Sequence, residues 1–129
     1  MHDPIPASTE AIAKQVVDAA FRVHSTLGPG LLESVYETCL SYELTKRSIP
    51  VRRQEAQPIR YDEIEIDAGL RLDLLVGDQV VVELKAVDSL EPIHTAQLLT
   101  YLKLSGNRLG LLINFNSVLI KDGIKRLVN

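Results

Sequence analysis

Three charged residues, Asp73, Glu83 and Lys85, stand inside short apolar segments of this 129-residue chain. The segments 70–76 and 80–85 are apolar at most of their other positions, a pattern typical of strands that are covered on both faces. An ionised group inside such a strand costs several kcal/mol unless it is paired or binds a metal. These three residues are therefore the first candidates for chemistry.

The spacing of these residues predicts that they converge. Glu83 and Lys85 are two positions apart and project from one face of a strand, and Asp73 lies on the preceding strand of the same hairpin. Two carboxylates can bind a hard divalent cation such as Mg²⁺ and leave positions for water and a phosphate oxygen. The lysine would orient or help to deprotonate the attacking water and offset charge in the transition state. The same residues are equally compatible with an exposed edge-strand ion pair between Glu83 and Lys85, with Asp73 beside a turn.

The loop between these two strands tests the metal-site hypothesis. The dipeptide Gly77-Asp78 favours a two-residue type II′ turn, which would set Asp73 opposite Val82 and turn Glu83 to the other face. A metal site needs Asp73 opposite Glu83 instead. That register requires a β-bulge or a three-residue loop that includes Gln79, so the hypothesis predicts that the regular two-residue hairpin is absent.

Two predicted helices carry further candidates. Glu33 opens the second helix, where the helix dipole accommodates a carboxylate, and Tyr36 faces the same way three residues later. Gln97 and Tyr101 are four residues apart, so they share one face of the third helix and supply hydrogen-bonding groups there. Alone, Glu33 is better explained as a structural residue at a helix start, and the second pair as a polar helix face.

The elements that must position these residues follow from the hydrophobic periodicity. Ser8 is predicted to cap a first helix that ends at Gly28, and a second helix ends before Pro50. A third helix is predicted from about Pro92 to about Leu104. Strands are predicted at 51–55, 58–62, 64–66, 70–76, 80–85, 109–115, 118–120 and 124–128. This order predicts an α/β fold, with α+β character, in which helices flank a mixed sheet.

The predicted second helix has an apolar stripe that includes Leu32, Val35, Tyr36, Cys39, Leu40 and Leu44. His24 and His94 have no partner at a spacing typical of metal ligands. Both histidines are therefore interpreted as surface or boundary residues.

The composition describes an ordinary globular chain, with 46% hydrophobic and 24% charged residues. We expect a short N-terminal tail, 1–7, and a single domain, 8–129. The single cysteine, Cys39, excludes an internal disulfide framework and favours a reducing cytoplasm. The first residues lack signal-peptide features, and no apolar run approaches the roughly 18 residues of a membrane span, so we expect neither export nor membrane insertion.

The charge balance limits how the chain could contact nucleic acid. With 14 basic and 17 acidic residues the formal net charge is −3, which argues against electrostatic binding of the phosphate backbone over a broad surface. A nucleic-acid role would depend on local basic patches or bound cations. The basic residues that are candidates for backbone contacts are Lys46, Arg47, Arg52, Arg53, Lys121, Lys125 and Arg126.

The order and spacing of these motifs resemble the PD-(D/E)XK nuclease superfamily, and in particular its branch with a RecB-type Q-L-x-x-Y helix. The resemblance covers about residues 23–128 and includes the strand 110–115. A second motif matches the one that names the small GxxExxY protein family. The motifs that carry the resemblance are Gly30-x-x-Glu33-x-x-Tyr36, Asp73, Glu83-x-Lys85 and Gln97-Leu98-x-x-Tyr101.

The resemblance implies a restriction-endonuclease-like core and a role for each motif residue. By similarity Glu33, Asp73 and Glu83 are ligands of Mg²⁺ or Mn²⁺. Lys85 is catalytic together with Asp73 and Glu83, while Gln97 and Tyr101 position the lysine or a phosphate.

The implied function is a metal-dependent nuclease that hydrolyses phosphodiester bonds, of DNA rather than RNA. The alternative is a non-catalytic module that keeps the nuclease fold and binds nucleic acid or a protein, because fold alone does not settle function. Small size and net negative charge favour a homodimer or a larger assembly.

Overall fold

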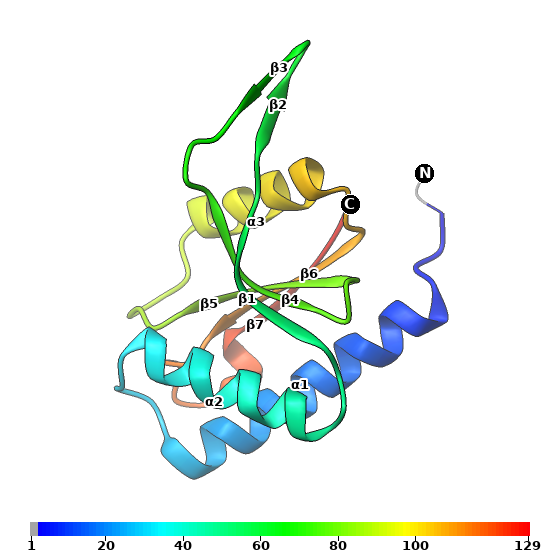
Figure 1. The fold of residues 1–129 in the computed structure, drawn as a ribbon. Helices are drawn as coiled ribbons and strands as arrows, with labels where there is room; N and C mark the ends of the chain where they lie inside the picture. Colours follow the sequence, from blue (N-terminus) through cyan, green and yellow to red (C-terminus); the bar gives the residue numbers. More distant parts are fainter. Residues whose placement is uncertain (1–2) are drawn as a thin grey trace.

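A five-stranded mixed sheet separates two layers of helices in the computed structural model, which describes residues 3–129 (Figure 1). The strand order is β1-β4-β5-β6-β7, in which β5 and β6 are parallel and the other pairs are antiparallel. The predicted mixed sheet with flanking helices is confirmed. The elements are α1 (Ala7–Leu27), α2 (Glu33–Lys46), β1 (Val51–Ala56), β2 (Ile59–Tyr61), β3 (Ile64–Ile66), β4 (Arg71–Val76), β5 (Val80–Lys85), α3 (Pro92–Ser105), β6 (Leu109–Asn114), the 3-10 helix η1 (Ile120–Gly123) and β7 (Ile124–Val128).

The helices cover both faces of the sheet (Figure 1). Val80 and Val82 of β5 join the apolar cluster under α1 and α2, while Val81 between them joins the cluster under α3. This alternation confirms that β5 is buried on both faces, as its apolar sequence predicts. Within residues 3–129, none of the helices is both long and apolar enough to cross a membrane.

Helix α3 connects the parallel strands β5 and β6 and packs closely on β6. A Cβ atom at Gly110 would lie 3.2 Å from side-chain atoms of Leu98 and Leu102, so glycine permits this close approach. The parallel register pairs Lys85 with Asn114 at the carboxyl ends of the two strands. The packing of α3 therefore fixes the side chains of that helix relative to the end of β5.

The hairpin between β4 and β5 has a three-residue loop. Val76 pairs with Val80, and Gly77 and Asp78 in the loop have φ values of 58° and 59°. Leu74 pairs with Val82, so the next step of this register brings residue 73 opposite residue 83. The register that the metal-site hypothesis requires is confirmed, and the two-residue type II′ turn is wrong.

A short hairpin, β2 and β3, projects from the body between β1 and β4 (Figure 1). We call residues 57–69 the arm. Its strands pair only with each other, and Tyr61, Ile64 and Ile66 are exposed on them. The arm rises beside α3, at the end of β1 from which it leaves the sheet (Figure 1).

Two local predictions are wrong at the ends of elements. Ser8 does not cap α1, because the helix begins at Ala7 after Pro6, and the Ser8 hydroxyl donates to Gln79 Oε1 at 3.0 Å. The segment predicted as a strand at 118–120 forms a turn that leads into η1 instead. Val118 is 82% exposed there, so this short apolar run does not mark a buried strand.

Two further assignments concern burial. The predicted apolar stripe of α2 is only partly correct. Tyr36, Leu40 and Leu44 are buried, but Leu32 and Val35 are exposed. His24 is not a surface residue. It is buried at the end of α1, where its Nε2 lies 2.7 Å from the Ser117 carbonyl oxygen and ties the helix to the loop after β6.

Candidate functional site

Hydrogen bonds between carboxylates and backbone N–H groups connect Asp73 with Glu83 and Leu84 where the β4–β5 ladder ends. The backbone N–H of Asp73 donates to Glu83 Oε1 at 3.1 Å, and the N–H of Leu84 donates to Asp73 Oδ2 at 2.9 Å. Each carboxylate therefore occupies the place of a main-chain acceptor on the neighbouring strand. The Glu83 side chain is buried, with its residue 6% exposed. Asp73 and Glu83, which the sequence predicts to converge, are thus in contact through the backbone N–H of Asp73 and the carboxylate of Glu83.

This burial changes the protonation of Glu83. Desolvation, the largest cause, and the neighbouring Asp73 carboxylate raise the pKa of Glu83 to about 9, while the positive charge of Lys85 opposes the shift. In the absence of another cation, the site therefore favours a proton on this carboxylate at neutral pH. A divalent cation would compete for the same position.

Glu33 is the first residue of α2, and Tyr36 fixes the turn that precedes it. The buried Tyr36 hydroxyl donates to the Gly28 carbonyl oxygen at 2.6 Å and accepts from the Leu31 N–H at 3.1 Å. Its ring stacks on Phe115 after β6, with 4.7 Å between ring centroids. These contacts connect the start of α2 to the carboxyl end of strand β6.

The electrostatic environment of Glu33 places it near the acidic pair. Partial desolvation of its carboxyl group and then the Asp73 carboxylate raise the pKa of Glu33, and Lys85 lowers it. The residue itself is exposed. Glu33 therefore lies within electrostatic range of Asp73 and Lys85, at the surface entrance to the site.

Lys85 ends β5, and the backbone around it is held by the end of β6. The Phe115 N–H donates to the Lys85 carbonyl oxygen at 2.9 Å. The buried Asn114 side chain accepts from the Val87 N–H at 3.1 Å and donates to the Val87 carbonyl oxygen at 2.9 Å. The Asn114 side chain thereby forms the two backbone hydrogen bonds that a neighbouring strand would otherwise form with Val87, two residues after Lys85.

Asn114→Ala is expected to destabilise the protein by about 1–3 kcal/mol, because the partly buried Val87 N–H loses its acceptor and the Val87 carbonyl oxygen loses the shorter of its two hydrogen bonds. The matched control is Asn116→Ala, since Asn116 donates a single longer hydrogen bond, 3.3 Å, to the same carbonyl oxygen. Urea unfolding at equilibrium measures both changes. Equal midpoints for the two variants would contradict the anchoring role of Asn114.

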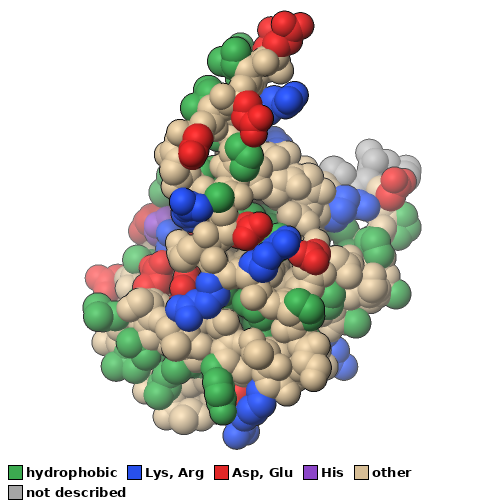
Figure 2. Space-filling model, in the orientation of Figure 1, with side chains coloured by type: hydrophobic (Ala, Val, Ile, Leu, Met, Phe, Trp, Pro, Cys, Tyr) green, Lys and Arg blue, Asp and Glu red, His purple; other side chains and the backbone are tan. Residues whose placement is uncertain are grey.

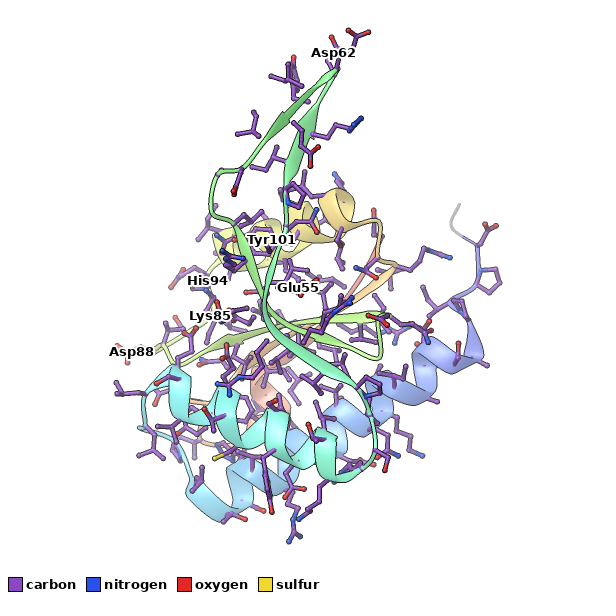
Figure 3. The ribbon with its side chains drawn as sticks, in the orientation of Figure 1. Glu55, Asp62, Lys85, Asp88, His94 and Tyr101 are labelled. Atoms are coloured by element: carbon purple, nitrogen blue, oxygen red, sulfur yellow. The ribbon has the colours of Figure 1, made fainter. Side chains whose placement is uncertain are left out.

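Helix α3 brings Tyr101 to the acidic pair. Burial, followed by the charges of Glu83 and Asp73, raises the pKa of the Tyr101 hydroxyl. Figure 3 shows Tyr101, His94 and Lys85 on the side of the molecule between the arm and α2. Gln97, one turn before Tyr101, is exposed, and both residues line a hollow between α3 and the arm. His94 accepts the Glu91 N–H at 3.0 Å, a helix-capping contact.

The described part of the chain, residues 3–129, contains no group of three or more His, Cys, Asp or Glu side chains arranged to hold one ion. Asp73 and Glu83 are in contact, whereas Glu33 lies at the surface within electrostatic range of Asp73 and forms no hydrogen bond with either acid. The structure thus brings two of the three predicted ligands together.

Sequence reasoning missed two residues beside the site. Gln54 Nε2 donates to Glu37 Oε1 at 2.6 Å and lies 3.4 Å from Asp73 Oδ1. Gln54 has a φ of 49°, a left-handed conformation that interrupts the β1–β4 pairing opposite Asp73. Glu37 follows Glu33 by one helical turn, which would have indicated a shared face. We find no comparable sequence signal for Gln54.

Several of the basic candidates for backbone contacts are engaged in ion pairs. Arg53 Nη2 lies 3.0 Å from Glu37 Oε2, and Arg126 Nη1 lies 2.6 Å from Glu10 Oε1. Arg52 pairs with Asp78 in the β4–β5 loop. Neighbouring carboxylates therefore partly compensate the positive charge of these three arginines.

Comparison with known proteins identifies the family. Residues 10–127 match the family model described as PD-(D/E)XK nuclease superfamily. Neither the curated proteins nor the solved structures contain a match. The family model covers most of the chain, including α2, the β4–β5 hairpin and α3. The chain therefore belongs to the PD-(D/E)XK nuclease superfamily.

Proposed function

We propose that this protein is a metal-dependent nuclease that hydrolyses phosphodiester bonds of DNA. The observation that carries the proposal is the contact between Asp73 and Glu83, inside the adjacent strands β4 and β5 where their pairing ends, with Lys85 following on the same strand as Glu83. Superfamily membership implies a nucleic-acid substrate and, in general, divalent metal ions. The narrower assignments rest on two motifs: the spacing of Gln97, Leu98 and Tyr101 supports the RecB-type branch, and that of Gly30, Glu33 and Tyr36 supports the GxxExxY family.

The donor groups fit a hard divalent cation. Asp73 and Glu83 supply carboxylate oxygens, the ligands that Mg²⁺ and Mn²⁺ prefer, and the hydrogen bonds described above involve chiefly one oxygen of each. Desolvation and the neighbouring Asp73 charge raise the pKa of Glu83, so a cation at this position would stabilise the ionised form of Glu83. Asp73 and Glu83 would hold the ion, and Glu33, whose pKa responds to the Asp73 charge, is the proposed third ligand. A bound ion lowers the pKa of water and offsets charge on the phosphate.

The remaining site residues act on the substrate and the water. Lys85 has an ammonium group that can orient the attacking water and offset charge on the phosphate in the transition state. The Tyr101 hydroxyl can donate a hydrogen bond to a phosphate oxygen or accept one from the Lys85 ammonium group. Gln97, one turn away, offers both a donor and an acceptor to the same strand of substrate.

One observation favours the alternative of a non-catalytic binding module. Each acid of the central pair already satisfies a backbone N–H, so both have a structural role without a metal. A binding module would keep these hydrogen bonds and the fold without cutting nucleic acid.

Metal binding separates the two functions. Mn²⁺ is expected to raise the melting temperature of the wild-type protein by mass action, and Asp73→Asn, which keeps the side chain's shape, is expected to abolish this shift. Calorimetric titration with Mn²⁺ and thermal scans measure both effects.

The same samples are assayed with Mg²⁺, Mn²⁺ or EDTA on single-stranded, duplex and branched DNA. We expect cleavage that EDTA and Asp73→Asn both remove. Identical melting curves with and without millimolar Mn²⁺, together with uncut substrates, would overturn the nuclease proposal in favour of the binding module.

A further inference from the structure

An apolar hollow lies next to the candidate site, between α3 and the base of the arm. We call it the α3 pocket. Its volume is about 380 Å³, and its lining residues are Ile59, Leu70, Ile93, Ala96, Gln97, Thr100, Tyr101 and Leu104. Its walls are mainly aliphatic, apart from the Tyr101 ring and the polar ends of Gln97 and Thr100. A hollow of this kind can accept the flat, apolar face of a nucleobase.

Tyr101 links the α3 pocket to the acidic pair. The Tyr101 ring packs beside the buried cluster under α3 and lines the pocket, and its hydroxyl is within electrostatic range of Glu83 and Asp73. A strand whose phosphate lies at these carboxylates therefore has a neighbouring base within reach of the pocket. Gln97 stands at the same boundary and can hydrogen-bond to a base edge.

The arm above the α3 pocket is strongly acidic. It contains one arginine, Arg60, and four carboxylates, Asp62, Glu63, Glu65 and Asp67, so its formal charge of −3 equals that of the whole chain. Figure 2 shows acidic side chains at the tip and along the length of the arm, and Figure 3 shows Asp62 at the tip. The arm thus repels phosphate groups, within a Debye length of about 8 Å at physiological salt.

Building on the nuclease function proposed above, we propose that the α3 pocket seats an unpaired base of single-stranded DNA beside the phosphate at Asp73 and Glu83. A base in a duplex is stacked and paired, so it must leave the stack before its face can enter such a hollow. A second strand would also bring its phosphates toward the acidic arm. Both features favour a single strand, which needs no unpairing and brings fewer phosphates toward the arm than a duplex does.

Binding measurements test the pocket independently of cleavage. Fluorescence anisotropy is measured with Mg²⁺ in the Lys85→Ala background, so that the strand is not consumed, on a labelled single-stranded oligonucleotide, the same strand with abasic positions, and its duplex. Stacking of a base on an aromatic ring such as that of Tyr101 strengthens single-strand binding, so we expect the intact single strand to bind about 10-fold tighter than the abasic strand and the duplex.

Two substitutions localise the preference. Ala96→Trp fills the α3 pocket from the exposed surface of the helix and is expected to reduce single-strand affinity about 10-fold. Val118→Trp, which adds the same side chain at an exposed site on another loop, is the matched control and is expected to leave affinity unchanged. Replacing Asp62, Glu63 and Glu65 of the arm with lysine is expected to raise duplex affinity.

The outcomes distinguish this inference from the nuclease function itself. Equal affinity for intact strand, abasic strand and duplex, or an Ala96→Trp variant that binds like Val118→Trp, would overturn the pocket assignment, even if the wild-type protein cuts DNA. A clear single-strand preference in a wild-type protein that cuts no substrate would support the pocket and overturn the nuclease function.

Discussion

Lys85→Ala is expected to lower the rate of DNA cleavage by about 10²–10³-fold, the usual cost of removing a group that stabilises transition-state charge. The affinity for Mn²⁺ is expected to remain nearly unchanged, because an ammonium group is not a metal ligand. Affinity for DNA is expected to fall only by the loss of one phosphate contact. Single-turnover cleavage, calorimetric titration with Mn²⁺ and DNA-binding titrations at several salt concentrations measure the three quantities separately.

The matched control is Lys103→Ala, which removes an equal charge from the exposed surface of α3. It is expected to cleave at close to the wild-type rate. If the Lys85 and Lys103 variants lose activity to the same small extent, Lys85 contributes only general electrostatics. If Lys85→Ala instead abolishes Mn²⁺ binding, its role is to preserve the structure of the site.

Glu83→Gln is expected to change stability in opposite directions without and with divalent metal. The pKa of Glu83 is raised from the ordinary 4.5 to about 9 in the folded protein. The folded state thus holds this proton more tightly than the unfolded state does. The associated stability is complete below about pH 4.5 and declines toward pH 9, by at most about 1.4 kcal/mol per pH unit.

Glutamine cannot ionise, and its amide oxygen can still accept the Asp73 N–H. In EDTA, the melting temperature of Glu83→Gln is therefore expected to vary less between pH 5 and pH 8 than that of the wild type, and to be higher at pH 8. With metal at 100 times its dissociation constant, the wild type gains about 2.7 kcal/mol and the variant loses most of this gain.

The same substitution at Glu63, on the exposed arm, provides the control for the chemical change. Glu63→Gln is expected to keep the steep pH dependence and the metal-induced stabilisation of the wild type. Parallel pH profiles for Glu83→Gln and the wild type would show that Glu83 ionises in the metal-free protein as it does in water.

The fold was predictable wherever burial leaves a periodic pattern. Strands β4 and β5 are apolar on both faces because helices cover both, and their sequence shows this directly. The run at 118–120 has the same apolar character, but only Ile120 is buried there. The difference depends on a tertiary contact, since Gly123 packs against Ser117 and the Asn114 carbonyl oxygen so closely that a Cβ would clash. Local pattern contains no information on such a contact.

The candidate site was predictable only in part. The hairpin places Asp73 opposite Glu83, and strand alternation alone connects Glu83 with Lys85. The position of Glu33 depends on the stacking of Tyr36 on Phe115, a contact between distant segments that no spacing rule supplies. Gln54 reaches Asp73 because its backbone is left-handed, a conformation that its sequence context does not indicate.

The three-residue loop between β4 and β5 makes the chemistry of this protein sensitive to the parity of insertions. Adding or deleting one residue at Gly77, Asp78 or Gln79 would shift the pairing by one and carry either Asp73 or Glu83 to the opposite face, while leaving both strands apolar and foldable. An insertion of two residues would restore the alignment. Among related proteins that keep the acidic pair, the length of this loop should therefore differ by an even number of residues. A difference of an odd number would indicate a relative that keeps the fold but has lost the site.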